Sequence, residues 1–432
     1  MSAIQMNSNS NSSLINTLES SDSMENPNVY STKTIYPATS TTWTRCEKSN
    51  GVSENGSQQN FNLNKYGIVE QILFTYTKSW EVAEVIPPVT DPITAPTEGS
   101  ATLQAGDMFN VIDRIELLSS SRVISILTQS DLISQFSNLD GSQYQVIKRT
   151  GVDERGKTEL LTARDKGVKV SETYTFPLTF GFFQDINTQL NVSFVEPISI
   201  RVVYGANANQ ALTGTPLTTD YLTSTFLYVR YKSYSESATA QILASNYNQP
   251  ELIQVSSRFY DESPEIKKNA STGSAADTMT CQLRNTDCVQ SFYVMVRKID
   301  SANNTLGNPV QINEIVFRGS GQEILKLDSG AIQYGKLTEN GFSMGQCASD
   351  ATDTANMRNV AKIQTGLWEN SGGGKLSNTL SLREINAPEI EVTFDSSGQP
   401  AETQWRMDVA ENCTAIYSTS SAVGRLSLAL SN

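Results

Sequence analysis

The 432-residue chain contains no histidine. Histidine is the most common general base, the most common metal ligand and the usual partner of a nucleophilic serine or cysteine. Most hydrolytic mechanisms are therefore excluded, and carboxylate chemistry is what remains. Pairs such as Asp261/Glu262 or Glu384/Glu389 could in principle serve a glycosidase. Carboxylates are so abundant that no pair stands out, and we predict a non-enzymatic protein without catalytic residues.

Cysteine is scarce and irregularly spaced. The set is odd in number and has no C-x-x-C spacing, so the sequence indicates neither a zinc site nor a disulfide framework. Cys281 and Cys288 could meet across a hairpin, although two unpaired buried thiols fit the pattern better. We predict no bound metal and no cofactor. The five cysteines are Cys46, Cys281, Cys288, Cys347 and Cys413.

Long hydrophobic runs are also missing. No stretch of about 18 consecutive apolar residues occurs, which predicts a chain without a transmembrane segment. The first residues, MSAIQMNSNSNSS, have neither the basic start nor the apolar stretch of a signal peptide. We therefore expect synthesis in the cytosol without such a peptide.

Basic residues are outnumbered by acidic ones. The chain has 32 Lys and Arg against 45 Asp and Glu, for a net charge of -13. Because phosphate binding needs clustered Lys and Arg, this balance disfavours a nucleic acid as a direct partner. The basic stretch from Arg164 to Lys169 is short and contains Asp165, so we interpret it as a solvated loop.

β-strand patterning is what the chain has in abundance. Residues 1–58 are dominated by Ser, Asn, Thr and Glu, a composition typical of a flexible arm. After that, apolar strand blocks alternate with polar loops, the longest of which are residues 137–172 and 335–360. The persuasive helix of the first half follows residue 128, and Ser130 or Asp131 could cap it.

One pattern, I-[DN]-[RE]-I-x-[LF]-x-[SG]-S-[SG]-[RQ]-x-I, occurs twice, 200 residues apart. It runs from Ile112 to Ile124 and again from Ile312 to Ile324, and each copy predicts a β-hairpin with a turn of small residues. The second turn contains glycines and the first only serines, so the two turns need not be of the same type.

A second correspondence supports a duplicated fold. The segment that begins at Pro197 resembles the segment that begins at Pro388, one residue out of step. Chance similarity between two hairpins is the alternative, but tandem duplication explains both correspondences. We predict an all-β fold of two tandem eight-stranded jelly-roll sandwiches with few short helices, the first over residues 59–237 and the second over 238–432.

Three segments resemble the double jelly-roll major capsid proteins of double-stranded DNA viruses. They are GDMFNVIDRIEL at 106–117, FPLTFGFF at 176–183 and FVEPISI at 194–200. The resemblance extends over about residues 60–430. In size and in its arm, the chain is most similar to the capsid proteins of polinton-like viruses, virophages and related algal viruses.

The resemblance implies a major capsid protein of the virion that assembles as pseudo-hexagonal homotrimers into an icosahedral shell. Neighbouring capsomers, minor capsid proteins and penton proteins would then be its partners. The alternative is a carbohydrate- or receptor-binding jelly-roll module, such as a fibre or lectin, with its site on the long loops. Candidate contact residues between subunits are the loop aromatics Tyr144, Tyr221, Phe342 and Trp368.

Overall fold

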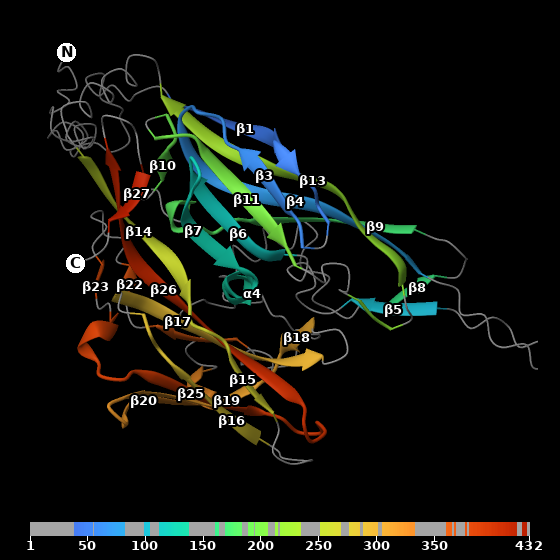
Figure 1. The fold of residues 1–432 in the computed structure, drawn as a ribbon, viewed down its shortest axis with the longest axis vertical. Helices are drawn as coiled ribbons and strands as arrows, with labels where there is room; N and C mark the ends of the chain where they lie inside the picture. The colour runs from blue at the N-terminus through green and yellow to red at the C-terminus, as the bar shows by residue number, and fades with distance from the viewer. Residues whose placement is uncertain are drawn as a thin grey trace, which may run out of the picture.

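The structure is a computed structural model, and β-strands make up most of what it describes. The all-β class is confirmed, and Figure 1 shows the strands gathered into two sandwiches that lie side by side. The longest helix described is α4 (Gln129–Ser137). The described residues are 39–54, 56–82, 99–103, 112–137, 160–163, 169–183, 189–193, 195–205, 212–214, 217–234, 251–268, 276–285, 288–300, 305–332, 360–364, 367–368, 376–377, 380–420 and 426–429.

The first half of the chain forms two antiparallel sheets that share one core. One sheet has the order β1-β13-β4-β10, with β9 also paired to β4, and the other has the order β2-β3-β11-β6-β7. Without the two-residue strands β2 and β10, these are the eight strands of the predicted roll. The first sheet contains β1 (Thr39–Glu47), β4 (Ile68–Val82), β9 (Lys169–Pro177), β10 (Leu190–Asn191) and β13 (Leu217–Tyr234). The second contains β2 (Asn50–Gly51), β3 (Gln58–Asn62), β6 (Ile112–Ser119), β7 (Arg122–Thr128) and β11 (Ile198–Tyr204).

The second half repeats this architecture. Its larger sheet has the order β14-β26-β17-β18 with β15, β21, β24 and β27 at its sides, and its smaller sheet has the order β16-β25-β19-β20. The larger sheet contains β14 (Glu251–Asp261), β15 (Glu265–Lys268), β17 (Cys288–Asp300), β18 (Thr305–Pro309), β21 (Val360–Gln364), β24 (Leu380–Ser381), β26 (Gln404–Ser420) and β27 (Leu426–Ala429). The smaller contains β16 (Ala276–Gln282), β19 (Ile312–Gly319), β20 (Gln322–Asp328) and β25 (Glu389–Asp395).

Strand alternation builds both cores. In β11 the residues Ile198, Ile200 and Val202 are buried and alternate with partly exposed neighbours, as a sheet with one face inward requires. In the second roll the rings of Phe394 and Trp405, from facing sheets, lie 5.1 Å apart. Each roll therefore has an interior of its own.

Two small sheets lie outside the sandwiches. Strands β5 (Gly99–Leu103), β8 (Leu160–Ala163) and β12 (Leu212–Gly214) form a three-stranded sheet that projects to one side in Figure 1. Strands β22 (Leu367–Trp368) and β23 (Leu376–Ser377) form a pair. The predicted loop over residues 137–172 therefore contains β8 and the beginning of β9. Of the predicted loop over residues 335–360, only Val360 is among the described residues.

Both copies of the repeated pattern are hairpins with the same register. In each, the residues that flank the turn pair directly, and the ladder shifts at the same point, between residues 117 and 118 and between residues 317 and 318. Such bulges are built features of a backbone rather than random defects. Their agreement is strong support for the predicted duplication.

The two hairpin turns differ, a point that the sequence left open. Ser120 and Ser320 both have a positive φ, of 56° and 52°. Gly321 continues with a positive φ of 73°, whereas Ser121 does not. Two consecutive positive φ angles characterise a type I′ turn and one at the first central residue a type II′ turn. The glycine of the second copy therefore decides the turn type.

The offset of one residue between the Pro197 and Pro388 segments has a structural cause. The amides of Ser120 and Ser320 donate to the carbonyl oxygens of Pro197 and Asn386, at 2.7 and 2.6 Å. We count residues from each of these carbonyl groups to the equivalent paired residue of the β6–β11 or β19–β25 ladder. The second half of the chain has one residue more in this stretch. Ala387 lies in that stretch with a φ of 48°, which is uncommon for a residue with a Cβ atom.

Strand β1 corrects the predicted N-terminal arm. It pairs along its whole length with β13, and β2 and the first residue of β3 also precede residue 59. The arm predicted over residues 1–58 is therefore wrong for residues 39–54 and 56–58, and residues 1–38 lie outside the described part. The predicted boundary between residues 237 and 238 falls between β13 and β14, outside the described residues, and stays a prediction.

The two rolls pack tightly against each other. In η1 (Gly181–Phe183), Phe182 contacts Tyr417 of β26 with ring centroids 4.5 Å apart. Gly181 lies so close to β14 that a Cβ atom there would sit 2.1 Å from the carbonyl oxygen of Ser257. Five side chains of the second roll join the core of the first, namely Met295, Val360, Ala415, Tyr417 and Leu426.

We expect Gly181→Ala to lower the free energy of unfolding by about 1–3 kcal/mol, because the new methyl group would clash with the backbone of β14. Equilibrium unfolding in denaturant measures the change. Gly330→Ala is the control, since its Cβ atom would meet Asp328 Oδ1 at an ordinary 3.4 Å. The control should stay within about 0.5 kcal/mol of the unchanged chain. Unchanged stability of Gly181→Ala would contradict the close approach of the rolls.

Candidate functional site at the junction of the two rolls

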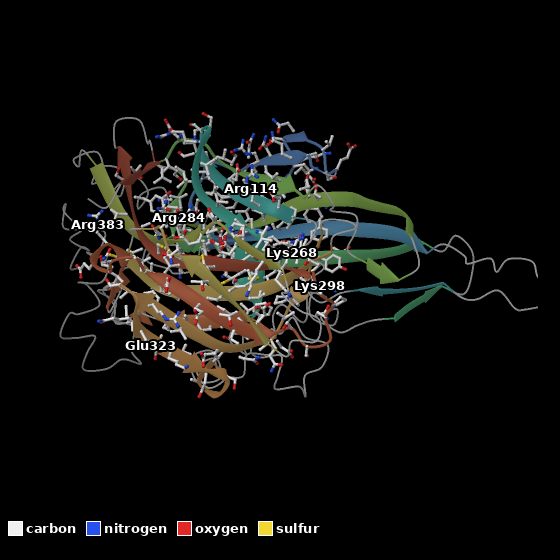
Figure 2. The ribbon with its side chains drawn as sticks, turned by 60° about the horizontal axis from the view of Figure 1, so that its bottom comes forward. Arg114, Lys268, Arg284, Lys298, Glu323 and Arg383 are labelled. Atoms are coloured by element: carbon white, nitrogen blue, oxygen red, sulfur yellow. The ribbon has the colours of Figure 1, made fainter. Side chains whose placement is uncertain are left out.

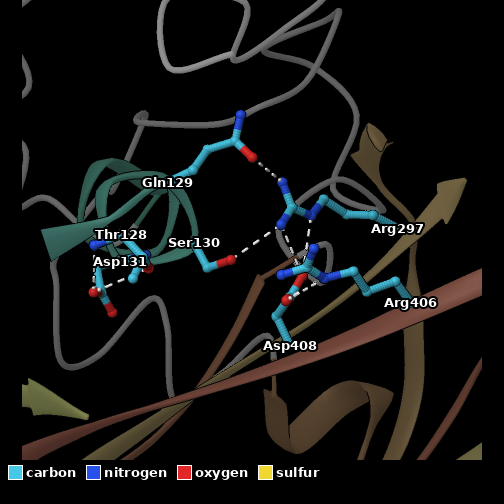
Figure 3. Close-up of polar contacts among 7 residues, drawn as sticks. All are labelled: Thr128, Gln129, Ser130, Asp131, Arg297, Arg406 and Asp408. Carbon is cyan, nitrogen blue, oxygen red and sulfur yellow. Dashed lines mark hydrogen bonds and ion pairs between the residues drawn. The ribbon is translucent and has the colours of Figure 1, made fainter. Parts of the chain in front are cut away.

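Helix α4 lies at the junction of the two rolls. It follows directly on β7 of the first roll and packs against β17 and β26 of the second (Figures 1 and 3). Its start is set by a capping box, in which Thr128 Oγ1 accepts the amide of Asp131 at 3.2 Å and Asp131 Oδ2 accepts the amide of Thr128 at 2.8 Å. The predicted cap, Ser130 or Asp131, is therefore wrong, and the cap is Thr128. The spacing T-x-x-D at 128–131 carried this signal.

The first turn of α4 meets a buried arginine of the second roll (Figure 3). Arg297 of β17 is 1% exposed and donates to Gln129 Oε1 at 3.1 Å, to Ser130 Oγ at 3.0 Å and to Asp408 Oδ2 at 2.8 Å. Asp408, on β26, also accepts Nε of Arg406 at 2.7 Å through its other oxygen. One buried carboxylate thus joins two guanidinium groups, and Ser130 binds Arg297 instead of capping the helix.

The Arg297 cluster fixes how the rolls are docked. A buried charge without a partner costs several kcal/mol, so a buried guanidinium needs acceptors for its donors. All three nitrogen atoms of Arg297 donate, two of them to acceptors that include side chains of α4. The satisfied state therefore requires both rolls in place.

A pair of carboxyl groups lies beside this cluster. Asp131 of α4 is fully buried, and burial raises its pKa well above the usual value, with the nearby Asp261 of β14 as the second cause. Burial also raises the pKa of Asp261, to about 6, against hydrogen bonds from Thr128 and Asp131 that lower it. The junction therefore contains a pair of acids that differ from ordinary surface carboxylates.

The carboxylate pairs suggested by the sequence do not act together. Asp261 contacts Asp131, whereas Glu262 accepts two backbone amides from the loop after β16. Glu384 is exposed in η4 (Leu382–Glu384), and Glu389 on β25 accepts a hydrogen bond from a β16 side chain. The two members of each pair thus have different hydrogen-bond partners, and among the described residues neither pair is linked to a common group.

The cysteines are free thiols wherever the structure describes them. Cys281 is buried and Cys288 is exposed, so the predicted unpaired state is confirmed for both and the predicted burial for Cys281 alone. Cys46 and Cys413 are free as well. Burial raises the pKa of Cys281 to about 12, so this thiol stays protonated at neutral pH.

The aromatic candidates and the basic stretch are only partly within the described residues. Tyr221 lies in β13 and Trp368 in β22, while Tyr144 and Phe342 are outside. Residues 164–168 are outside too, and Lys169 begins β9. Among the residues that the structure describes, no group of three or more Cys, Asp or Glu side chains could hold a metal ion. In the same segments, no helix has the length and apolar character needed to span a bilayer.

Solved structures share the two-roll arrangement. The chain matches the Faustovirus major capsid protein with a TM-score of 0.62 at 10% identity, over 90% of this chain and 92% of that one. It matches PBCV-1 VP54, in a crystal structure fitted into a reconstruction of the virophage Sputnik, with a TM-score of 0.61 at 11% identity, over 94% and 99%. For the mavirus major capsid protein the TM-score is 0.59 at 12% identity, over 94% and 93%.

These likenesses establish the fold, and the predicted double jelly roll is confirmed. No protein-family model matches the sequence, and no curated protein does. The fold is thus recognisable from the backbone although little of the sequence is shared. The solved structures have their fold in common with this chain over at least nine-tenths of its length.

We expect Asp408→Leu to destabilise the chain by about 3–5 kcal/mol, because it leaves the buried charge of Arg297 without its partner. Arg297→Met should cost less, because Asp408 keeps its ion pair with Arg406. Equilibrium unfolding measures both, and the double variant should recover much of the loss because it removes both charges. Lys298→Ala is the control, as the exposed Nζ of Lys298 bonds Gln399 at 2.8 Å. It should change stability by less than about 0.5 kcal/mol. Strictly additive losses in the double variant would argue against a coupled pair.

Proposed function

We propose that the chain is a major capsid protein, a non-enzymatic subunit that assembles into the icosahedral shell of a virion. The extent of the structural likeness carries this proposal. The Faustovirus and mavirus major capsid proteins match over at least nine-tenths of both chains, so the likeness includes both rolls and the way they are joined. A carbohydrate- or receptor-binding module needs only one such sandwich, so the paired arrangement favours a shell subunit.

The duplication suggests which surfaces join the copies. Strands β4, β13 and β1 of the first roll correspond to β17, β26 and β14 of the second. The β4–β13 ladder and the β17–β26 ladder shift register at equivalent places. The shift leaves residue 70 of β4 and residue 290 of β17 out of the strand pairing. Following the rungs from there, Trp43 of β1 corresponds to Phe259 of β14. The sheet face that receives α4 in the second roll thus has a counterpart in the first.

That counterpart, the β1–β13 face, is rich in aromatic and arginine side chains. Its residues alternate with the buried core residues of β13 and so point outward. Trp43 is 49% exposed, and the guanidinium of Arg45 lies 4.0 Å from the ring centroid of Phe226. Aromatic residues and arginine are enriched where proteins bind one another. The face consists of Trp43, Arg45, Phe226, Tyr228 and Arg230.

The complementary surface is strand β20, the counterpart of β7 in the second roll. Ile324 of β20 is 53% exposed, whereas its counterpart Ile124 is 7% exposed under the cover of the other roll. Glu323 and Asp328 are also exposed on β20, and Figure 2 shows Glu323 on the second roll, well away from Arg114 on the first. Glu323, Ile324 and Asp328 form what we call the β20 edge, in which acidic groups flank an exposed apolar side chain. On docking, these acids could join the ion pairs that Arg45 and Arg230 make with Glu47 and Glu70.

In this arrangement the β20 edge of one copy docks on the β1–β13 face of the next copy. The contact between chains then repeats the contact that β7 and α4 make within one chain. A contact between two different patches forms a ring when its rotation closes. Three copies would place six rolls around such a ring, which is the pseudo-hexagonal homotrimer. Neighbouring capsomers, minor capsid proteins and penton proteins would then surround it in the shell.

We expect a solution mass of three times the 47.3 kDa chain, about 142 kDa by light scattering, and a pseudo-hexagonal outline in electron micrographs. A chain that stays monomeric or dimeric at every concentration and salt condition would contradict the proposal. A glycan-array hit from such a monomer would support the carbohydrate-binding alternative instead.

We expect Ile324→Lys and Trp43→Ala each to weaken the trimer by at least about tenfold in its dissociation constant, because each removes an apolar anchor from the contact. Sedimentation velocity over a concentration series measures this. Ile266→Lys is the matched control, since Ile266 is 61% exposed on β15 and belongs to neither surface. If the control dissociates the trimer as readily as Ile324→Lys does, the assignment of the surfaces fails.

A further inference from the structure

Asp131 has a hydrogen-bonding problem at the junction of the rolls. Its side chain is fully buried at the start of α4. Oδ2 accepts hydrogen bonds from the amide and the hydroxyl of Thr128, at 2.8 and 3.1 Å. Oδ1 is buried and no donor among the described residues reaches it. A buried acceptor left in this state is costly, so the group needs a proton or a donor.

The group that faces Asp131 is a second carboxyl. Asp261 of β14, a strand that packs against β7, lies next to Asp131 across the junction, and its own Oδ1 is buried without a donor. Two ionised carboxylates have acceptors only and cannot hydrogen-bond to each other. The contact therefore requires that one of them keeps its proton, as paired acids in close contact do.

We propose that Asp131 and Asp261 share one proton across the junction, and that this carboxyl–carboxylate hydrogen bond is a pH-sensitive latch between the two rolls. Asp131 donates and Asp261 accepts while the latch is closed. Loss of the shared proton leaves two apposed negative charges at the start of α4, which weakens the docking of the rolls. The latch is a property of the single chain and does not depend on the proposed shell.

The surrounding charges leave the pair as the titrating centre of the junction. Asp408 raises the pKa of Asp261 and Arg406 lowers it, and these two residues are bonded to each other. The charge of Arg297 is likewise bound to Asp408. Charged side chains on the elements around the pair are Asp408 and Arg406 on β26, Arg297 on β17, Arg258 and Glu262 on and after β14, Arg122 at the far end of β7, and the paired Arg114 and Glu116 on β6.

The duplication shows that the pair is specific to this junction. By the hairpin register, the counterpart of Asp131 is Ala331, and by the β1–β13 ladder the counterpart of Asp261 is Arg45. Neither counterpart is an acid, although the backbone around both is repeated. The carboxyl pair is therefore an addition to the duplicated backbone rather than a part of it.

The direction of the pH effect follows from the raised pKa values. In the unfolded chain an aspartate releases its proton near pH 4. In the folded chain Asp261 does so at about 6, and the pKa of Asp131 is likewise raised well above its usual value by burial and by Asp261. The folded chain thus holds protons that the unfolded chain has lost, so the stabilisation is complete below about pH 4 and is lost as the pH rises through 6 and beyond.

The test uses Asp131→Asn in the full-length chain. The asparagine Oδ1 can accept the amide of Thr128 while its Nδ2 donates permanently to Asp261, which replaces the shared proton with a fixed donor. We expect the thermal midpoint of the unchanged chain to fall more steeply than that of Asp131→Asn between pH 6 and pH 9, so that the variant becomes the more stable of the two at pH 9. The infrared band of a protonated carboxyl, present at pH 7 in the unchanged chain, should disappear in the variant.

Two controls keep the result decisive. Asp261→Asn supplies the fixed donor from the other side, so it should lose the same infrared band and serves if Asp131→Asn does not fold. Asp113→Asn removes an exposed carboxyl on β6 and should keep both the band and the steep pH dependence. Absence of the band in the unchanged chain would overturn the proposal. Equal pH dependence in the unchanged chain and both junction variants would do the same.

Discussion

The burial of Arg297 is the constraint on which the arrangement of the two rolls depends. A guanidinium that is 1% exposed keeps its charge, so its surroundings must supply both a counter-charge and further acceptors. Asp408 supplies the charge from the second roll, and the start of α4 supplies the neutral acceptors from the first. Hydrogen bonds tolerate little displacement, so the bonds of Arg297 fix how the two rolls are docked. The contacts around Gly181 and Phe182 form in this same docked position.

Duplication has preserved the backbone more strictly than the side chains. The hairpin bulges and the register shifts of β4 and β17 recur at the same places. The charge pairs on the β6–β11 and β19–β25 ladders differ, since Glu116 of β6 binds Arg201 of β11, whereas Arg318 of β19, at a position two residues further along, binds Glu391 of β25. A ladder fixes where neighbouring side chains meet and leaves open which positions carry charge. This explains why the repeat is plain in the structure and faint in the sequence.

The same distinction decides what the sequence could predict. The hairpins at Ile112 and Ile312 were predictable because turn chemistry and strand pattern are local. Strand β1 was not, because its sequence, TSTTWTRCE, has the polar composition of an arm and becomes a strand only by pairing with β13. The capping box of α4 was visible as a local T-x-x-D spacing. The Arg297 cluster was not, because it joins residues more than a hundred positions apart, and only the fold brings them together.

The junction within the chain and the proposed contact between copies face different physical demands, and their chemistry follows. Within one chain the rolls are always at high effective concentration, so the junction can include groups that are costly to desolvate, such as Arg297 and the Asp131–Asp261 pair. A surface that joins separate copies must be soluble before it docks and must gain enough on docking to offset the loss of free motion. Exposed aromatic and arginine side chains such as Trp43 and Arg45 meet both conditions, because they are hydrated when free and bury large contact areas when bound. The repeated backbone therefore carries polar, titratable side chains at the junction within the chain, and amphipathic side chains on the face that we propose joins separate copies.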